Sequence, residues 1–123
     1  MTTICLVDDS ATIRMSVAEN LQRAGYSVEA FPDAQKALDY LQNGNKPDLI
    51  ITDLNMPGMD GISFIKEARN IRGMRFKPIL FLTTESEQAK RDEAKKAGAT
   101  GWLVKPVSAD DLLGAVKQVA PGA

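Results

Sequence analysis

The sequence predicts a single α/β domain, built on a five-stranded, doubly wound parallel sheet with five helices. Five apolar runs of strand length alternate with segments of helical periodicity along the 123 residues. Two of these runs, Leu49–Thr52 (LIIT) and Ile79–Leu82 (ILFL), show no polar alternation, which is typical of strands covered on both faces. Repeated strand-then-helix units with right-handed crossovers give a doubly wound sheet. We expect residues 1–123 to form this one domain.

The five strands are predicted from short apolar runs rich in branched side chains. They are Thr3–Val7, Ser27–Phe31, Leu49–Thr52, Ile79–Leu82 and Gly101–Val104.

The first three helices are predicted from their boundary residues and apolar stripes. The first ends at Gly25, the second begins after Asp33 and ends at Gly44, and the third begins near Gly61. Their stripes are, in order, Ile13-Val17-Leu21-Ala24, Ala37-Leu38-Leu41 and Ile62-Ile65-Ala68.

The last two helices differ in how much apolar surface they offer. The fourth, Ser86–Ala97, is highly charged and is expected to be loosely held. The fifth starts at Ser108, and Asp111 three residues later matches the pattern of a capping box. Ala120–Ala123 is expected to be a frayed tail. The apolar positions are Ala89, Ala94 and Ala97 in the fourth helix, and Leu112, Val116 and Val119 in the fifth.

Two connecting segments have distinctive composition. Residues 69–77 contain four basic residues and no acid, which favours a solvated loop over a docking patch. Gly58 and Gly61 are interpreted as turn residues with positive φ.

Composition excludes several classes of protein. A net charge of −1 indicates no strong attraction to nucleic acid or membrane, and no apolar run approaches the ~20 residues of a membrane span. No signal peptide is visible at the N-terminus. The absence of histidine excludes histidine-based nucleophilic sites and histidine metal ligands. The single cysteine, Cys5, excludes an internal disulfide and fits a reducing cytoplasm. We expect a cytoplasmic monomer.

Polar residues directly follow four of the five predicted strands. Asp8 and Asp9 follow the first, Asp53 the third, Thr83 the fourth and Lys105 the fifth. Because the carboxyl ends of parallel strands meet at one edge of a sheet, we expect these side chains to come together. On their own, Asp8 and Asp9 are better explained as a turn and a helix start, but the matching strand ends favour a site.

Three crowded carboxylates repel one another, by about 4 kcal/mol for each pair at ~4 Å and an effective dielectric of about 20. One lysine does not neutralise three negative charges. An all-oxygen site suits Mg²⁺, and bound Mg²⁺ together with Lys105 would leave the cluster ready for a phosphoryl group.

Four short motifs occur in a distinctive order and spacing over essentially the whole chain. They are LVDDS at 6–10, DLNMPGMDG at 53–61, LTTE at 82–85 and KP at 105–106. Together they resemble the response-regulator receiver domains of bacterial two-component systems, and most closely the stand-alone chemotaxis receivers of the CheY type. The resemblance implies a flavodoxin-like sheet with strand order 2-1-3-4-5.

The resemblance also implies the roles of the acidic residues. Asp53 stands at the position that accepts a phosphoryl group. Asp9 and Asp53 match direct Mg²⁺ ligands, Asp8 acts mainly through water, and the backbone carbonyl of Asn55 completes the protein ligands.

Further roles follow from the same resemblance. Lys105 matches the lysine that pairs with a phosphoryl oxygen, Thr83 the switch hydroxyl, and Pro106 a proline preceded by a cis peptide bond. Two positions depart from the common pattern. Thr84 stands where a small residue is usual, and its bulk would narrow access to the acceptor. Trp102 stands where the switch aromatic is usually tyrosine or phenylalanine.

The implied function is a phosphorylation-dependent switch. We expect no enzyme in the usual sense, although the domain assists its own aspartyl phosphorylation and dephosphorylation. The expected donor is a histidine kinase or its phosphotransfer domain, and the expected output partner is a protein such as a flagellar motor switch component. The alternative is a phosphorelay intermediate that passes the phosphoryl group to a histidine phosphotransfer protein.

Two other classes fit the residues less well. A hydrolase with an aspartyl-phosphate intermediate usually carries a second acid two positions after its nucleophile, where this chain has Asn55. A flavin-binding module needs a phosphate-cradling loop after the first strand, where Asp8 and Asp9 would repel a phosphate.

Overall fold

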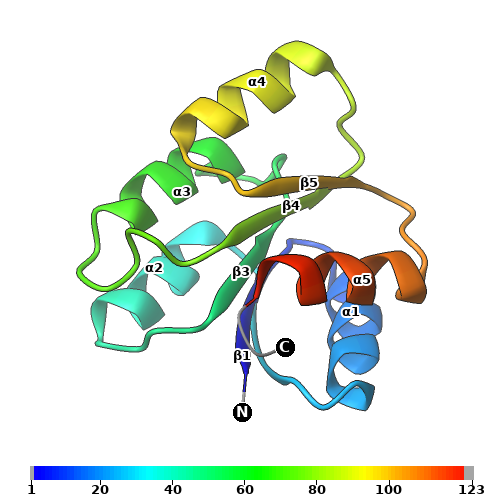
Figure 1. The fold of residues 1–123 in the computed structure, drawn as a ribbon. Helices are drawn as coiled ribbons and strands as arrows, with labels where there is room; N and C mark the ends of the chain where they lie inside the picture. The colour runs from blue at the N-terminus through cyan, green and yellow to red at the C-terminus, as the bar shows by residue number, and fades with distance from the viewer. Residues whose placement is uncertain (1, 121–123) are drawn as a thin grey trace.

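The computed structural model describes residues 2–120 and shows a doubly wound α/β fold (Figure 1). One sheet of five parallel strands has the order β2-β1-β3-β4-β5. The predicted fold class and the strand order implied by the resemblance are both confirmed. The strands are β1 Thr3–Val7, β2 Ser27–Phe31, β3 Leu49–Thr52, β4 Ile79–Thr83 and β5 Gly101–Val104. The helices are α1 Ala11–Arg23, α2 Ala34–Gln42, α3 Gly61–Arg69, α4 Gln88–Ala97 and α5 Ala109–Val119.

Each face of the sheet carries its own core. Helices α1 and α5 cover one face, whereas α2, α3 and α4 cover the other (Figure 1). Alternate residues of β1 serve the two cores: Ile4 and Leu6 face α1 and α5, and Cys5 and Val7 face the other helices. Burial raises the pKa of the Cys5 thiol to about 12, so this thiol is a packing group. The two-sided burial explains why the central strands lack polar alternation.

Side-chain caps set the start of four helices. The predicted caps Asp33 and Ser108 accept hydrogen bonds from the backbone amides three residues later, at 2.8 and 3.0 Å. Ser10 and Asp60 cap α1 and α3 in the same way, at 3.3 and 2.8 Å. The fourth helix has no side-chain cap hydrogen bond at Glu87. It begins at Gln88, two residues later than the predicted start at Ser86.

Three predictions at the ends of helices were wrong. Ala24 and Ala89, both assigned to apolar stripes, are exposed, because Ala24 lies just beyond the end of α1 and Ala89 faces solvent in α4. Ala120 is only 3% exposed and packs in the core beneath α1 and α5, so the chain is not frayed there. Residues 121–123 lie outside the described residues. Among residues 2–120, no helix is long and apolar enough to cross a membrane.

The segment 69–77 is largely exposed, as predicted for a solvated loop, but hydrogen bonds and Met74 fix it to the rest of the domain. Arg69, the last residue of α3, donates hydrogen bonds to the backbone carbonyls of Met74 at 2.9 Å, Gly98 at 2.6 Å and Lys77. Met74 is only 1% exposed and packs in the core. A single guanidinium therefore ties the α3–β4 connection to the end of α4.

We expect Arg69→Met to lower the free energy of unfolding by about 2 kcal/mol, because partly buried carbonyl groups lose a charged donor. Urea denaturation measures this change. Arg72→Met is the matched control, since Arg72 is exposed and its replacement should change stability by less than about 0.5 kcal/mol. Equal stabilities for the two variants would show that the Arg69 hydrogen bonds contribute nothing net.

Candidate functional site

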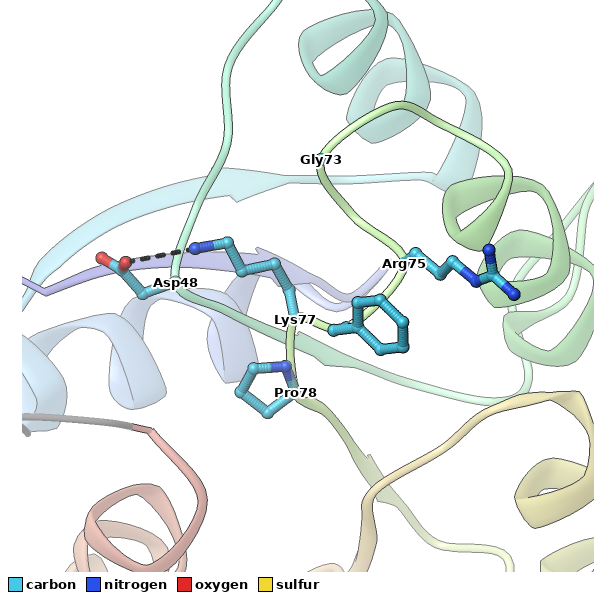
Figure 2. A pocket seen from close by; sticks show the side chains of 6 residues that line it. Asp48, Gly73, Arg75, Lys77 and Pro78 are labelled. Carbon is cyan, nitrogen blue, oxygen red and sulfur yellow. Dashed lines mark ion pairs between the residues drawn. The ribbon is translucent and has the colours of Figure 1, made fainter.

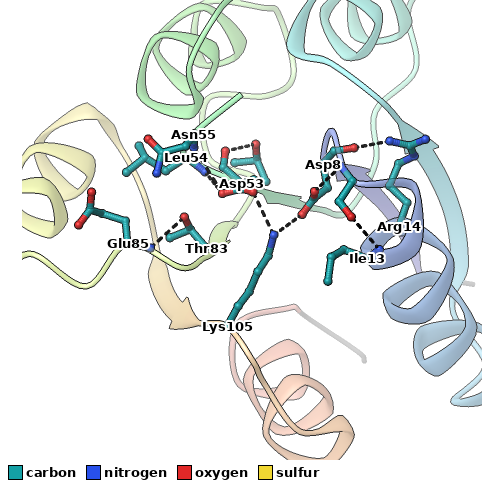
Figure 3. A network of polar contacts seen from close by, with 11 residues as sticks. Asp8, Ile13, Arg14, Asp53, Leu54, Asn55, Thr83, Glu85 and Lys105 are labelled. Carbon is teal, nitrogen blue, oxygen red and sulfur yellow. Dashed lines mark hydrogen bonds and ion pairs between the residues drawn. The ribbon is translucent and has the colours of Figure 1, made fainter. Parts of the chain in front are cut away.

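The carboxyl ends of four strands bring the predicted polar residues together (Figure 3). Parallel pairing sets Val7 opposite Thr52, and the amide of Asp53 donates to the carbonyl of Val7 at 2.9 Å. Asp8 and Asp53 directly follow β1 and β3, so they are neighbours as well. Lys105 reaches the same place from the end of β5. The predicted convergence of Asp8, Asp53 and Lys105 is confirmed.

The three acidic residues form one cluster. One carboxylate oxygen from each of Asp8, Asp9 and Asp53 lies within 4.8 Å of the others. Asp8 and Asp53 are only 1% and 8% exposed, whereas Asp9 is exposed. Grouped carboxylate oxygens are suitable ligands for a hard divalent cation, and the exposed Asp9 leaves one side of the cluster open to solvent. The donor set therefore fits the predicted metal.

Lys105 is the cation paired with this cluster. Its Nζ lies 2.6 Å from Asp8 Oδ2 and 3.0 Å from Asp53 Oδ2. Partial burial alone would lower the pKa of Lys105, but hydrogen bonds and charge from Asp8 and Asp53 outweigh it and raise the pKa above its ordinary value of 10.5. The resulting stabilisation is complete below that ordinary value and is lost only as pH rises through the higher folded-state pKa.

The second oxygen of Asp53 is held by the backbone that follows it. Asp53 Oδ1 accepts hydrogen bonds from the amides of Leu54 at 2.6 Å and Asn55 at 3.4 Å. Amide donors hold Oδ1 and Lys105 holds Oδ2, so both oxygens of the carboxylate are oriented. The assignment of the Asn55 carbonyl as a metal ligand stays a prediction.

Gly61 has a different role from the one predicted. Gly58 has a φ of +79°, as a turn glycine should, but Gly61 is a buried helix residue without a positive φ. A Cβ atom at Gly61 would lie 2.3 Å from the carbonyl oxygen of Asp53 and 2.6 Å from the ring of Phe81. The amide of Gly61 also donates to the carbonyl of Leu54 at 2.7 Å. Glycine is therefore required because α3 begins against the backbone of the Asp53 loop.

Arg14 belongs to the site, although sequence reasoning missed it. Its guanidinium donates to the carbonyl oxygen of Asp8 at 2.6 Å, and the amide of Ser10 donates to Asp8 Oδ1 at 2.9 Å (Figure 3). Together these contacts fix the turn that carries Asp8 and Asp9. The available signal was a basic residue in the first turns of the helix after the acidic pair.

Thr83 is linked to Trp102 through one residue. The Thr83 side chain is completely buried, and its Oγ1 accepts a hydrogen bond from the Glu85 amide at 3.3 Å. The indole Nε1 of Trp102 donates to the Glu85 carbonyl at 3.0 Å, and its ring packs against Phe81 with centroids 5.3 Å apart. The backbone of Glu85 thus joins the hydroxyl at the site to the ring on β5.

Thr84 and Pro106 lie beside this network. Thr84 is exposed and borders, together with Lys105 and Pro106, a hollow of about 480 Å³ between α1 and α5. The peptide bond between Lys105 and Pro106 is cis, as the resemblance implied.

Comparisons with known proteins agree with this geometry. The CheY4 chemotaxis protein of Vibrio cholerae has a solved structure that superposes with a TM-score of 0.93, at 45% identity over 97% of this chain and 98% of that one. The chemotaxis protein CheY-3 of Vibrio cholerae is 36% identical over 110 residues, which are 89% of this chain and 84% of that protein.

A third relative is longer. The transcriptional regulatory protein PdtaR of Mycobacterium tuberculosis is 39% identical over 115 residues, or 93% of this chain, yet the chain spans only 54% of that protein. Residues 4–117 match the family described as the response regulator receiver domain. The chain therefore belongs to the response regulator receiver domain family.

Proposed function

We propose that the chain is a phosphorylation-dependent signalling switch that accepts a phosphoryl group on Asp53 in the presence of Mg²⁺. The arrangement around Asp53 carries this proposal. Its carboxylate lies 3.0 Å from the ammonium group of Lys105 and beside Asp8 and Asp9, which can share a metal with it. Family membership supports the same function.

The chemistry is an in-line displacement. An Asp53 carboxylate oxygen forms a bond to phosphorus, the bond from phosphorus to a donor imidazole nitrogen breaks, and that nitrogen leaves with its electron pair and takes up a proton. These 123 residues contain no histidine, so the donor histidine lies outside them. Lys105 would offset the charge that develops on the transferring oxygens, and a cation held by Asp8, Asp9 and Asp53 would supply further positive charge there.

Output is proposed to run from Thr83 to Trp102. The Thr83 hydroxyl would donate to a phosphoryl oxygen, and rotation of the side chain toward that oxygen would break the hydrogen bond that Thr83 Oγ1 accepts from the Glu85 amide. The Glu85 backbone that holds the indole would then be released. The surface around α4, β5 and α5 would then change for a protein partner. Chemotaxis relatives that match nearly full-length support a motor-switch component as that partner.

Asp53→Asn should abolish phosphorylation while the fold remains intact, because an amide does not form the acyl phosphate. Incubation with acetyl phosphate and Mg²⁺, followed by intact-mass measurement, tests this expectation. Asp39→Asn, an exposed replacement on α2, should be phosphorylated like the parent protein. A mass shift of one phosphoryl group on Asp53→Asn would remove Asp53 from this role.

Mg²⁺ should raise the melting temperature of the parent protein, because it relieves repulsion in the acidic cluster and binds only the folded state. The rise should grow with Mg²⁺ concentration and be much smaller in Asp9→Asn. Asp9 is the exposed member of the cluster, so its replacement should leave the metal-free melting curve nearly unchanged. Equal metal-dependent shifts in both proteins would place the metal elsewhere.

Trp102 emission should change modestly on activation with Mg²⁺ and beryllofluoride. One or two charge-assisted hydrogen bonds contribute about 1.5–3 kcal/mol each, whereas a shift from 1:99 to 99:1 needs about 5.5 kcal/mol. Trp102 is the only tryptophan, so fluorescence reports it alone. Thr83→Ala should reduce the change. Identical emission from the parent in its free and activated states would show that Trp102 is only a packing residue.

A further inference from the structure

A second distinctive surface lies at the opposite edge of the sheet from Asp53. It is formed where the chain enters β3 and β4, and we call it the basic–aromatic surface. It contains a hollow of about 510 Å³ (Figure 2). The hollow is lined by Asp48, Gly73, Arg75, Phe76, Lys77 and Pro78.

The loop that carries this surface is held in one shape. The Arg69 guanidinium donates hydrogen bonds to the carbonyls of Met74 and Lys77, and the Met74 side chain is buried in the core. Gly73 has a φ of +90°, and a Cβ atom there would lie 2.2 Å from Cε of Lys46. The side chain of Lys46 therefore lies directly over Gly73, which brings a further positive charge to the surface.

Phe76 is held out in water by this fixed loop. Its side chain is 89% exposed, more than the other two exposed large apolar residues among residues 2–120, Met15 at 73% and Val104 at 42%. The Arg75 guanidinium lies over the Phe76 ring, 5.5 Å from its centroid. An aromatic ring next to arginine is the composition found where proteins bind one another, because such a ring offers a large apolar area to a partner.

The surface has an excess of positive charge. Lys77 faces Asp48 with 3.8 Å between their charged atoms, and Asp48 also accepts a hydrogen bond from the Thr3 amide at 2.8 Å (Figure 2). Across residues 2–120, no ion pair includes Lys46, Arg72 or Arg75. The one carboxylate is thus satisfied, and three cations stay available on a chain whose net charge is −1.

We propose that the basic–aromatic surface docks an acidic peptide segment of another protein, and that an apolar side chain of this segment covers Phe76. A second copy of the chain is a poorer occupant, because its net charge is only −1 and it carries the same basic surface. Nucleic acid is also disfavoured, because Asp48 lies within the surface and the whole chain is slightly acidic.

The position of this surface separates it from the phosphorylation site. Strands β3 and β4 contain four and five residues, which span roughly 15 Å in a parallel sheet. The length of these strands separates the basic–aromatic surface from Asp53. A segment bound at the basic–aromatic surface leaves Asp53 open. It therefore binds the phosphorylated and unphosphorylated protein alike, and anchors the receiver to its partner in both states.

The test uses a fluorescein-labelled synthetic peptide in which aspartate and glutamate residues flank a Leu-Phe pair. Fluorescence anisotropy should show binding that weakens as salt is added. Amide shifts in two-dimensional NMR should fall on residues 44–48 and 69–78. Phe76→Ser should weaken binding about tenfold, and Arg72→Gln with Arg75→Gln should weaken it by about three- to tenfold.

Matched controls make the outcome decisive. Met15→Ser removes an exposed apolar side chain from α1, and Lys36→Gln removes an exposed charge from α2, so both should bind like the parent. Beryllofluoride with Mg²⁺ should leave the affinity unchanged. Thermal melts should show that Phe76→Ser is folded.

Four results would overturn the proposal. The first is equal binding by Phe76→Ser and the parent, and the second is equal binding of a control peptide that carries Asn and Gln in place of its acids. The third is displacement of the peptide by an oligonucleotide of the same charge. The fourth is self-association of the chain that the Phe76→Ser replacement abolishes.

Discussion

Three carboxylates held against one lysine are the arrangement on which the site depends. The register of β1 and β3 places Asp8 and Asp53 side by side, and their burial removes the water that would weaken their repulsion. Lys105 contacts two of the three groups and leaves the cluster negative. In the proposed function, an added cation would offset this negative charge, and the same edge would then accept a phosphoryl group. The fold holds this electrostatic imbalance in place, because Asp8 and Asp53 immediately follow the buried strands β1 and β3, and Lys105 immediately follows β5.

The sequence predicted the strands and the acidic site well because both depend on local pattern. Central strands buried on both faces leave unbroken apolar runs, and a parallel sheet assigns every strand end to one edge, so Asp8, Asp53 and Lys105 could be grouped without coordinates. Arg69 and Gly61 could not be predicted in this way. The three carbonyls that Arg69 binds come from two segments, the α3–β4 connection and the end of α4, and Gly61 is needed for a backbone contact with Asp53. Such constraints arise only when distant segments meet.

The two edges of the sheet present opposite surfaces. At the carboxyl edge, charged groups are buried and paired, and Asp9 is the exposed member of the acidic cluster. At the amino edge, arginine and phenylalanine side chains are exposed over a loop that Arg69 fixes. Under the proposed function, burial would make the first edge responsive to small ions and phosphoryl groups, because a new charge there meets little screening. Exposure makes the second edge suited to a protein partner, since its cations remain hydrated until contact.

Tryptophan at position 102 alters the balance of the proposed switch. Its indole N–H donates to the Glu85 carbonyl, a bond that phenylalanine has no donor to make. A hydrogen bond of this kind contributes about 1 kcal/mol net, which is roughly a fivefold preference for the present conformation. Thr83 contacts the same residue through the Glu85 amide, so in the proposed switch a change at the hydroxyl would act on the segment that holds the indole. Within the proposed switch, this bond would hold the unphosphorylated conformation more firmly than phenylalanine would, and a larger share of the switching free energy would come from the partner that binds the changed surface.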